Sequence, residues 1–375
     1  MASIERRIRR GRHVWRVRYR TPEGIQRNKT FARRAEADRF LVSVEGAKLD
    51  GTFVDPARSK ETVGLWADHW LDGLVHIKPS TLSRYKGIVR KQIKPEWASV
   101  ELGSVTPAQV QQWVVRLAAN LSPASVRKVV QVFSLILDRA VKDGRLARNH
   151  ARGVNLPRVV KQEHCYLTHR QVAILATECG FPSDVSKHVS LAERENGTSR
   201  LLVLFLAYTG VRWGEMAALR VSRLDLVKRR ALIAESVTPV QGLGLVWGTP
   251  KSHQRRSVPI PRFLADELAS LIEGRSPTDL VFPSVRSGEP IRVTAFKRTF
   301  RRAADHIGVP DLHPHDLRHT AASLSIAAGA DVKVVQQMLG HASATMTLDL
   351  YGHLFDDRLD EVAVALDAAR AAANR

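Results

Sequence analysis

The stretch HPHDLRHTAAS, residues 313–323, carries the pattern that most constrains this 375-residue chain. His315 and Arg318 stand three positions apart, a spacing that places two side chains on the same side of a helix. Arginine offers a planar fork of N–H donors that matches the oxygens of a phosphate, and lysine cannot reproduce that fork. The stretch therefore predicts one turn of helix that presents an imidazole and a guanidinium to a phosphate.

Three further stretches hold residues that suit the same chemistry. They are TGVRWGEMAAL (209–219), TPKSHQRRSVPI (249–260) and LGHASATMTLDLYGHL (339–354), with Arg212, Lys251, His341 and Tyr351. Breaking a phosphodiester with a protein nucleophile requires positive charge around the phosphate, a nucleophile in line and an acid for the departing oxygen. The phenol of Tyr351 ordinarily has a pKa of about 10. Neighbouring guanidinium groups would lower that pKa, and His315 could accept the phenol proton.

In order and context, the four stretches resemble the sequence boxes of the tyrosine recombinase family, of the phage integrase type. The resemblance implies a site-specific DNA recombinase with the catalytic residues Arg212, Lys251, His315, Arg318, His341 and Tyr351. It implies that Tyr351 forms a covalent 3′-phosphotyrosine, that His341 hydrogen-bonds the phosphate and that Lys251 protonates the leaving 5′-oxygen. Glu215 matches an acidic position of the first box and is expected to support Arg212. A carboxylate on a helix surface is the other interpretation of Glu215.

Two interpretations from other classes compete with a recombinase. His315 and His319 have the i, i+4 spacing of a zinc helix, but Asp316 stands where the HExxH motif of a metal-dependent hydrolase needs glutamate. The second is a DNA-binding regulator with a degenerate catalytic fold, although no expected catalytic position is missing. We therefore expect an enzyme that uses no cofactor and no metal, and the sequence contains no GxxxxGK[ST] nucleotide-binding motif.

The charge of the chain indicates a polyanionic partner. A formal net charge of +21 and a pI near 10.6 favour nucleic acid over a ribosome-associated or membrane-surface role. The N-terminal residues lack the apolar segment of a signal peptide, and no apolar run reaches the length of a membrane span. Cys165 and Cys179 are too few for a disulfide framework. We expect a cytoplasmic, nucleoid-associated protein of a bacterial host, without a membrane partner.

Residues 1–57 are expected to form an arm-type DNA-binding domain. In HVWRVRYR (13–20), Arg16, Arg18 and Arg20 alternate with apolar residues, which predicts a strand with one basic face. The expected elements are strands near 4–8, 13–20 and 25–31 and a helix over 32–49. Such a sheet and helix resemble the arm-binding domain of larger phage integrases, whose sheet enters a DNA groove. A solvated basic edge on a small sheet is the alternative.

Residues 58–152 are predicted to form a helical core-binding bundle. Thr106-Pro107 and Ser122-Pro123 each place an N-cap hydroxyl before a proline at the first helical position. The expected helices lie near 62–77 and 80–93 and after these two caps. Lys86 and Arg127 are candidates for phosphate contacts, although single cations on helices are often only solvated. Residues 153–164 lack periodicity and carry a proline, which predicts a linker.

Residues 165–375 match the α+β catalytic domain of the family, followed by a C-terminal tail helix. We expect helices after Thr168 and over 201–210, one antiparallel sheet with strands near 230–237, 243–248 and 256–260, and helices to the end. In the tail, Leu359, Val362 and Leu366 share one helical stripe. By resemblance such a tail docks on a neighbouring subunit, and packing within one chain is the alternative. The chain as a whole is predicted to be multidomain, mainly α with small β-sheets.

The basic N-terminal sheet and the helical core-binding bundle, which precede the catalytic domain, favour a phage-type integrase. Such an enzyme integrates, and with a helper excises, phage or mobile-element DNA. The implied partners are double-stranded DNA at core and arm attachment sites, a homotetramer on that DNA, an excisionase and a host DNA-bending protein. A chromosome-dimer or transposon resolvase of the same chemistry, and a non-catalytic DNA-binding regulator, are the alternatives.

Overall fold

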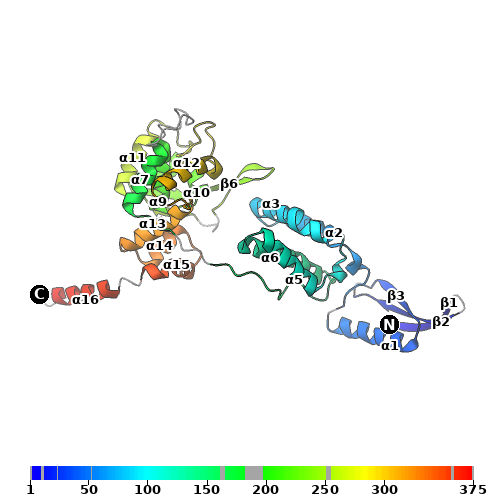
Figure 1. Cartoon of the computed structure of the whole chain (residues 1–375). Helices are drawn as coiled ribbons and strands as arrows, with labels where there is room; N and C mark the ends of the chain where they lie inside the picture. Colours follow the sequence, from blue (N-terminus) through cyan, green and yellow to red (C-terminus); the bar gives the residue numbers. More distant parts are fainter. Residues whose placement is uncertain are drawn as a thin grey trace. The chain divides into compact units, whose positions relative to one another are not determined.

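The computed structural model of the chain has two compact units, Met1–Lys161 and Gln162–Arg375 (Figure 1). The structure describes residues 2–9, 12–22, 24–51, 53–160, 165–181, 197–250, 255–355 and 359–373. Helices dominate both units, and the strands form small antiparallel sheets. The predicted class, mainly helical with small sheets, is confirmed.

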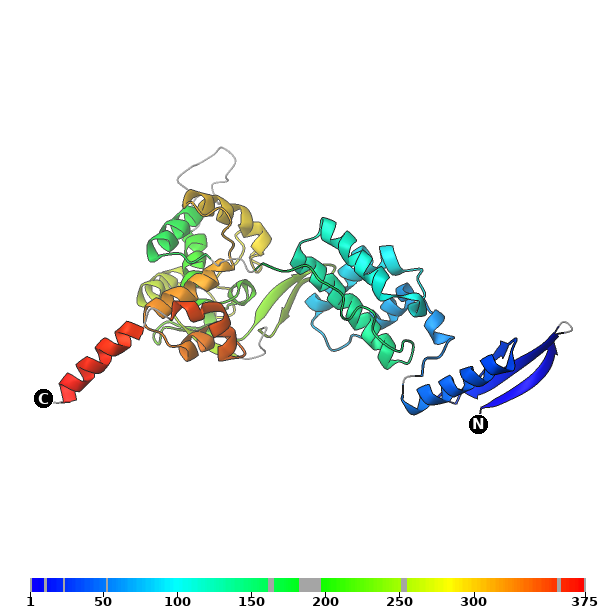
Figure 2. The ribbon, with the colours of Figure 1, turned by 60° about the horizontal axis from the view of Figure 1, so that its bottom comes forward.

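The first unit opens with a three-stranded antiparallel sheet of order β1-β2-β3, with a helix along one face (Figure 2). The elements are β1 (Ser3–Arg9), β2 (Arg12–Arg20), β3 (Gln26–Phe31) and α1 (Arg34–Leu49). Side chains alternate between the two faces of a strand, and Val17 and Tyr19 of β2 are buried because they lie on the face that packs against α1. Arg16 and Arg20 have the opposite parity, so the predicted basic face exists on this sheet.

The rest of the first unit is a bundle of helices around an aromatic centre. Its elements are η1 (Arg58–Lys60), α2 (Val63–Asp72), α3 (Pro79–Ile88), the π-turn η2 (Val89–Ile93), α4 (Lys94–Trp97), η3 (Leu102–Ser104), α5 (Pro107–Asn120) and α6 (Pro123–Lys142). The rings of Trp97, Trp113 and Phe133 pack with centroids 5.0–5.7 Å apart. The single helix expected over 80–93 is interrupted by the π-turn, which precedes Pro95, a residue with no N–H to continue the ladder.

Both N-cap predictions in the bundle are confirmed. The hydroxyl of Thr106 accepts the backbone N–H of Gln109, and the hydroxyl of Ser122 accepts that of Ser125. Each cap satisfies a donor that the first turn of a helix leaves unpaired. The long helix α6 that follows Ser122 then buries its apolar stripe in the bundle.

The second unit packs helices around α9, whose residues 201–207 are all buried. Its elements are α7 (His169–Gly180), α9 (Gly197–Thr209), α10 (Trp213–Ala217), η4 (Val221–Arg223), β4 (Leu224–Asp225), β5 (Arg230–Ile233), β6 (Ser236–Val240), β7 (Gly244–Gly248), β8 (Arg256–Pro259), α11 (Arg262–Ile272), α12 (Val293–His306), α13 (Asp316–Ala327), α14 (Val332–Leu339), α15 (Ala344–Tyr351), η5 (Gly352–Leu354) and α16 (Leu359–Ala373). None of the described helices combines the length and apolar character that a membrane crossing needs.

The strands of the second unit form two sheets, so the prediction of one sheet was wrong. β4, β5 and β8 form one sheet, whereas β6 and β7 pair only with each other as a hairpin. The strand expected over 230–237 ends at Ile233, and the chain leaves the first sheet there. The turn between β6 and β7 contains Gly242 with a φ of +82°, which allows the hairpin to close on itself.

Candidate active site

Arg212 lies between the buried helix α9 and the short helix α10. Glu215, in the first turn of α10, accepts the backbone N–H of Arg212 at 2.9 Å and its Nη1 at 3.1 Å. Glu215 is only 2% exposed, so its interpretation as a surface carboxylate was wrong. Burial opposes its ionisation, but the hydrogen bonds and charge of Arg256, together with Arg212, lower the pKa of Glu215 below its ordinary value.

Arg318 projects from the first turn of α13 into the interior of the second unit. Its Nη1 donates to the carbonyl oxygen of Gly210 at 2.5 Å, and its Nη2 donates to that of Leu339 at 2.7 Å. Burial lowers the pKa of Arg318 to about 9, and the neighbouring charge of Arg212 acts in the same direction. The guanidinium still carries its charge at neutral pH, so an anion beside it would relieve the cost of burying that charge.

His341 follows the C-terminal end of α14, where Gly340 adopts a left-handed conformation. The Nδ1 atom of His341 lies 3.0 Å from the hydroxyl of Thr347, a residue with no exposed surface. Burial lowers the pKa of His341 to about 4, with the charge of Arg318 as the next cause. The ring is therefore neutral at pH 7. A neutral ring that accepts the Thr347 proton at Nδ1 carries its own N–H at Nε2.

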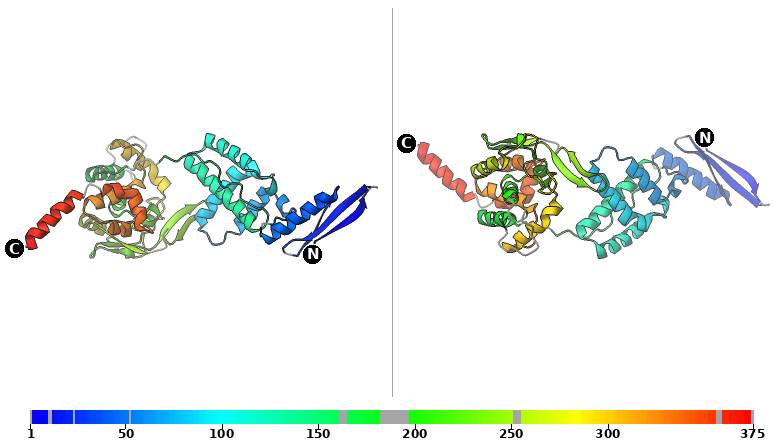
Figure 3. Two further views of the ribbon diagram at one scale, coloured as in Figure 1. Left: turned by 90° about the horizontal axis from the view of Figure 1, so that it is seen from below. Right: turned by 90° about the horizontal axis from the view of Figure 1, so that it is seen from above.

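Tyr351 ends α15 and is 1% exposed. Its hydroxyl lies 2.9 Å from Nδ1 of His319, and its ring lies parallel to that of His341 with centroids 6.5 Å apart. Burial raises the pKa of Tyr351 to about 12, while the charge of Arg318 acts in the opposite direction. His319 lies on α13 and Tyr351 on α15, while His341 follows α14. These three helices lie together in both views of Figure 3.

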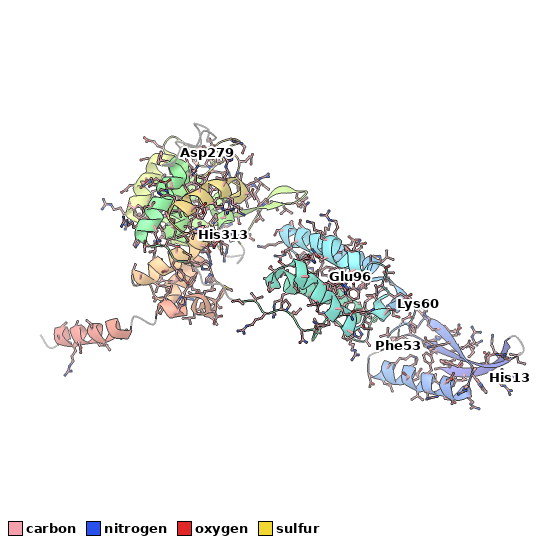
Figure 4. All side chains as sticks on the ribbon, in the orientation of Figure 1. His13, Phe53, Lys60, Glu96, Asp279 and His313 are labelled. Carbon is pink, nitrogen blue, oxygen red and sulfur yellow. The ribbon has the colours of Figure 1, made fainter. Side chains whose placement is uncertain are left out.

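The remaining two residues of the expected six lie differently. His315 is the N-cap residue of α13, is exposed, and its ring centroid is 5.6 Å from that of His319. Figure 4 labels His313, two positions before it in the chain. Lys251 lies outside the described residues, in the connection between β7 and β8. The structure thus brings Arg212, Arg318, His341 and Tyr351 together. The His315 ring lies beside the ring of His319, which in turn contacts Tyr351.

The five residues expected to contact DNA lie in the first unit. Arg20 and Lys86 are exposed and Arg16 is partly exposed, whereas Arg18 forms an ion pair with Glu5 at 3.1 Å. Arg127 is exposed, but its Nε donates to the carbonyl oxygen of Pro157 at 2.8 Å. These contacts leave guanidinium N–H groups of Arg18 and Arg127 for other acceptors, since each arginine has five donors.

Three polar residues of this site were missed by sequence reasoning. Arg256, Thr347 and His319 contact Glu215, His341 and Tyr351 respectively. His319 follows Arg318 directly in the chain, but its spacing from His315 suggested only a zinc ligand, and nothing in the local pattern marked Arg256 or Thr347. Within the described ranges, no group of three or more His, Cys, Asp or Glu side chains is arranged to hold a metal ion.

Comparison with protein families agrees with this geometry. The Phage integrase family matches residues 183–358, and the phage integrase N-terminal SAM-like domain matches residues 62–118. Together the two matches span more than half of the chain.

Curated relatives are integrases and recombinases. The putative prophage phiRv2 integrase of Mycobacterium tuberculosis is 27% identical over 94% of this chain and 92% of its own length. The ICEBs1 integrase of Bacillus subtilis is 25% identical over 77% of this chain and 78% of its own. Tyrosine recombinase XerC of Mycobacterium bovis is 29% identical over 70% of this chain and 83% of its own.

Solved structures of similar fold include DNA complexes. The Tn1549 transposon integrase with a circular intermediate DNA has a TM-score of 0.68 at 19% identity, covering 82% of this chain and 99% of that one. A lambda integrase tetramer bound to a Holliday junction has a TM-score of 0.56 at 19% identity, covering 91% of this chain and 96% of that one. Because both family models match it, the chain belongs to the phage integrase family and is a tyrosine site-specific recombinase that acts on DNA.

Proposed function

We propose that the chain integrates, and with a helper protein excises, phage or mobile-element DNA through a covalent 3′-phosphotyrosine at Tyr351. One observation carries most of the support. Arg212, His341 and Tyr351 all interact electrostatically with the buried Arg318, although they come from segments far apart in sequence. Two guanidinium groups, a neutral imidazole and a phenol at one place form a site for a phosphodiester that is about to be attacked.

The proposed reaction exchanges one phosphate ester for another. The guanidinium groups of Arg212 and Arg318 neutralise the non-bridging oxygens, and the Nε2–H of His341 donates to the phosphate. The Tyr351 phenol gives its proton to the His319 imidazole, which lies in contact with it. The Tyr351 oxygen forms a bond to phosphorus as the bond between phosphorus and the 5′-oxygen breaks, and Lys251 gives the 5′-oxygen a proton. Attack by a different 5′-hydroxyl reverses the step. Each bond broken is replaced by one of the same kind, so no nucleotide hydrolysis is required.

His315 completes the proposed set of six catalytic residues. It is exposed at the start of α13, three positions before Arg318 in sequence, and its ring lies beside that of His319. From that end of the helix its imidazole can hydrogen-bond a phosphate that enters from solvent. Glu215 acts in support, since its carboxylate contacts both the backbone and the guanidinium of Arg212.

The DNA contacts are divided among three parts of the chain in this proposal. Residues 1–57 bind arm-type sites through Arg16, Arg18 and Arg20, and residues 58–152 bind the core site with contributions from Lys86 and Arg127. Residues 153–164 connect them to the catalytic part, residues 165–375. The antiparallel register supports the arm assignment, because it places Arg16 opposite Thr30 and Arg18 opposite Asn28, which gives a polar face suited to DNA.

Strand exchange between two duplexes requires four copies of the chain on DNA. In the tail helix α16, Val362, Val364 and Leu366 are 55–69% exposed, and a neighbouring copy would cover such apolar side chains. An excisionase and a host DNA-bending protein are the further proposed partners. The match to the phiRv2 integrase extends over 94% of this chain and that to XerC over 70%, which favours an integrase over a chromosome-dimer resolvase.

Covalent capture of DNA tests the reaction. The full chain is incubated with fragmented DNA of a host that carries the element, protein-linked fragments are recovered under denaturing conditions, and their junctions are sequenced. A duplex nicked beside that junction should then trap a 3′-linked adduct on Tyr351. Tyr351→Phe should abolish the adduct, and Tyr208→Phe, which removes another phenol of the same unit, should not. An adduct that survives Tyr351→Phe would refute the assignment.

A further inference from the structure

Arg256, the first residue of β8, makes contacts that strand pairing does not require. Its backbone pairs with Ile233 of β5, as any strand residue would. Its side chain is only 9% exposed, and its Nη1 and Nη2 donate to the two oxygens of Glu215 at 3.1 and 2.6 Å. This is the bidentate geometry that only arginine offers a carboxylate.

The third contact of Arg256 leads to a different part of the site. Its Nε donates to the carbonyl oxygen of Met338 at 3.0 Å, near the C-terminal end of α14. The next carbonyl along, that of Leu339, accepts from Arg318 at 2.7 Å. Two arginines therefore hold two successive carbonyls just before Gly340 and His341. The last carbonyls of a helix lack partners within it, so these bonds fix where the helix ends.

Gly340 leaves room for this arrangement. A Cβ at that position would lie 2.9 Å from Cδ of Arg256 and 3.1 Å from its Cζ. The φ of +66° at Gly340 also disfavours any residue with a side chain. The guanidinium of Arg256 thus lies against the backbone that leads to His341. Its Nη1 and Nη2 atoms donate to the Glu215 carboxylate, which also accepts from Arg212.

We infer that Arg256 is a positioning residue for strand cleavage, which fixes Arg212 through Glu215 and His341 through the Met338 carbonyl. The inference rests on the proposed function, because it assigns to Arg212 and His341 the phosphate contacts proposed above. We assign no phosphate contact to Arg256 itself, because Nε, Nη1 and Nη2 each donate to a protein oxygen and the side chain is only 9% exposed. Its role is to keep two phosphate-binding groups in register with each other.

The expected consequence is a loss of rate without a loss of affinity. Arg256→Gln should leave the DNA dissociation constant within about twofold, because phosphate contacts over the whole duplex dominate affinity. The rate of adduct formation at saturating nicked DNA should fall by about 10- to 100-fold, the effect of a displacement near 1 Å at a reacting centre. Arg256→Lys, which can reach Glu215 but not form the same fork, should lie between wild type and Arg256→Gln.

A matched control separates this role from the loss of an arginine–glutamate pair as such. Arg200 forms a two-pronged ion pair with Glu267 on the outer side of α9, one contact at 3.1 Å. Arg200→Gln should form adduct at the wild-type rate. Circular dichroism and thermal unfolding of each variant establish that it is folded. If Arg256→Gln is unfolded, Arg256→Lys, which keeps the charge and most of the stem, is carried through the same measurements.

A chemically altered substrate distinguishes positioning from a general structural effect. A methylphosphonate at the cleavage position removes one negative oxygen, so an arginine that neutralises that oxygen becomes less necessary. Whichever diastereomer reduces the defect of Arg212→Ala should also reduce that of Arg256→Gln. A merely loosened fold would be slow on both diastereomers alike, and that result would overturn the inference.

The failure of the inference and the failure of the proposed function have different signatures. If Arg212→Ala forms adduct as fast as wild type, the proposed function is wrong. If Arg212→Ala is inactive while folded Arg256→Gln and Arg256→Lys match wild type at saturating DNA, only the role of Arg256 is wrong. Parallel defects in Arg212→Ala and Arg256→Gln, with normal DNA binding and a normal Arg200→Gln control, support both.

Discussion

The hydroxyl of Tyr351 lies 2.9 Å from Nδ1 of His319, and both side chains are buried. Sequence reasoning gave the phenol proton to His315, which the structure places on the exposed start of α13. Burial raises the pKa of Tyr351 to about 12, so at neutral pH the phenol needs a proton acceptor in contact with it before it can attack phosphorus. His319 occupies that position in the structure.

Replacing His319 should therefore slow cleavage. With His319→Phe the phenol loses its acceptor, and the rate of adduct formation at saturating nicked DNA should fall by about 100-fold or more, the usual contribution of a general base. His313→Ala, which removes an exposed imidazole bonded to the carbonyl of Asp311, should react like wild type. A His319→Phe protein that reacts faster than wild type would mean that the hydrogen bond holds the tyrosine back instead.

Thr347 should act through His341. Its hydroxyl can donate to Nδ1 of His341, and this places the ring proton on Nε2, where the phosphate is proposed to bind. Thr347→Val keeps the shape of the side chain but removes the donor, so the single-turnover rate should fall by about tenfold, as for one lost hydrogen bond in the transition state. Thr347→Ser should retain the rate. Equal rates for the two variants would contradict the assigned tautomer.

The depressed pKa of His341 makes the second unit sensitive to acid. An unfolded histidine titrates near pH 6.5, whereas burial lowers the pKa of His341 to about 4 in the folded chain. Between those values the unfolded chain binds a proton that the folded chain does not, so the free energy of unfolding falls as the pH falls from 6.5 to 4 and is unaffected above that window. The loss can reach about 3 kcal/mol, at roughly 1.4 kcal/mol per pKa unit.

Hydrogen exchange of the amides in α13–α15, measured across this pH window, gives the local free energy of opening. Wild type should lose more protection than His341→Asn between pH 7 and pH 4.5, because the variant has no group to titrate. An identical loss in both proteins would assign the acid sensitivity to other groups.

Most residues of the site could be predicted from the sequence, because each lies in a short motif whose spacing follows from local helix geometry. His315 and Arg318 share a helical turn, and Glu215 follows Arg212 by the three positions of a first helical turn. Arg256 could not be assigned in this way, since it reaches Glu215 across 41 positions and only the fold brings them together. The separate β6–β7 hairpin could not be predicted either, because the residue pattern of these two strands is equally compatible with pairing in the neighbouring sheet.

Gly210 should not accept a side chain without a loss of stability. An added Cβ would lie 2.6 Å from Cδ2 of Leu339, and its φ is +64°. Gly210→Ala should lower the free energy of unfolding by about 2 kcal/mol or more, because crowding adds to backbone strain. Gly274→Ala is the matched control: its φ is +71°, but nothing lies within 4 Å of the added Cβ, so only the strain remains. Equal melting temperatures for the two variants would show that Leu339 yields without cost.

The basic face of the N-terminal sheet should bind arm-type DNA through individual phosphate contacts. Arg16→Gln with Arg20→Gln removes two charges from that face, so the affinity for arm duplexes should drop and the slope of log K against log salt should fall by about 2. Arg33→Gln with Arg39→Gln removes the same charge beside and within α1, where both side chains are exposed, and should change arm binding little. Adduct formation on an isolated core duplex should be normal for both proteins, because residues 1–57 are proposed to act only on arm sites. If the sheet variant loses core cleavage as well, residues 1–57 do not act only on arm sites. If the two double variants lose arm affinity equally, the total charge of the domain determines arm binding and the basic face of the sheet does not.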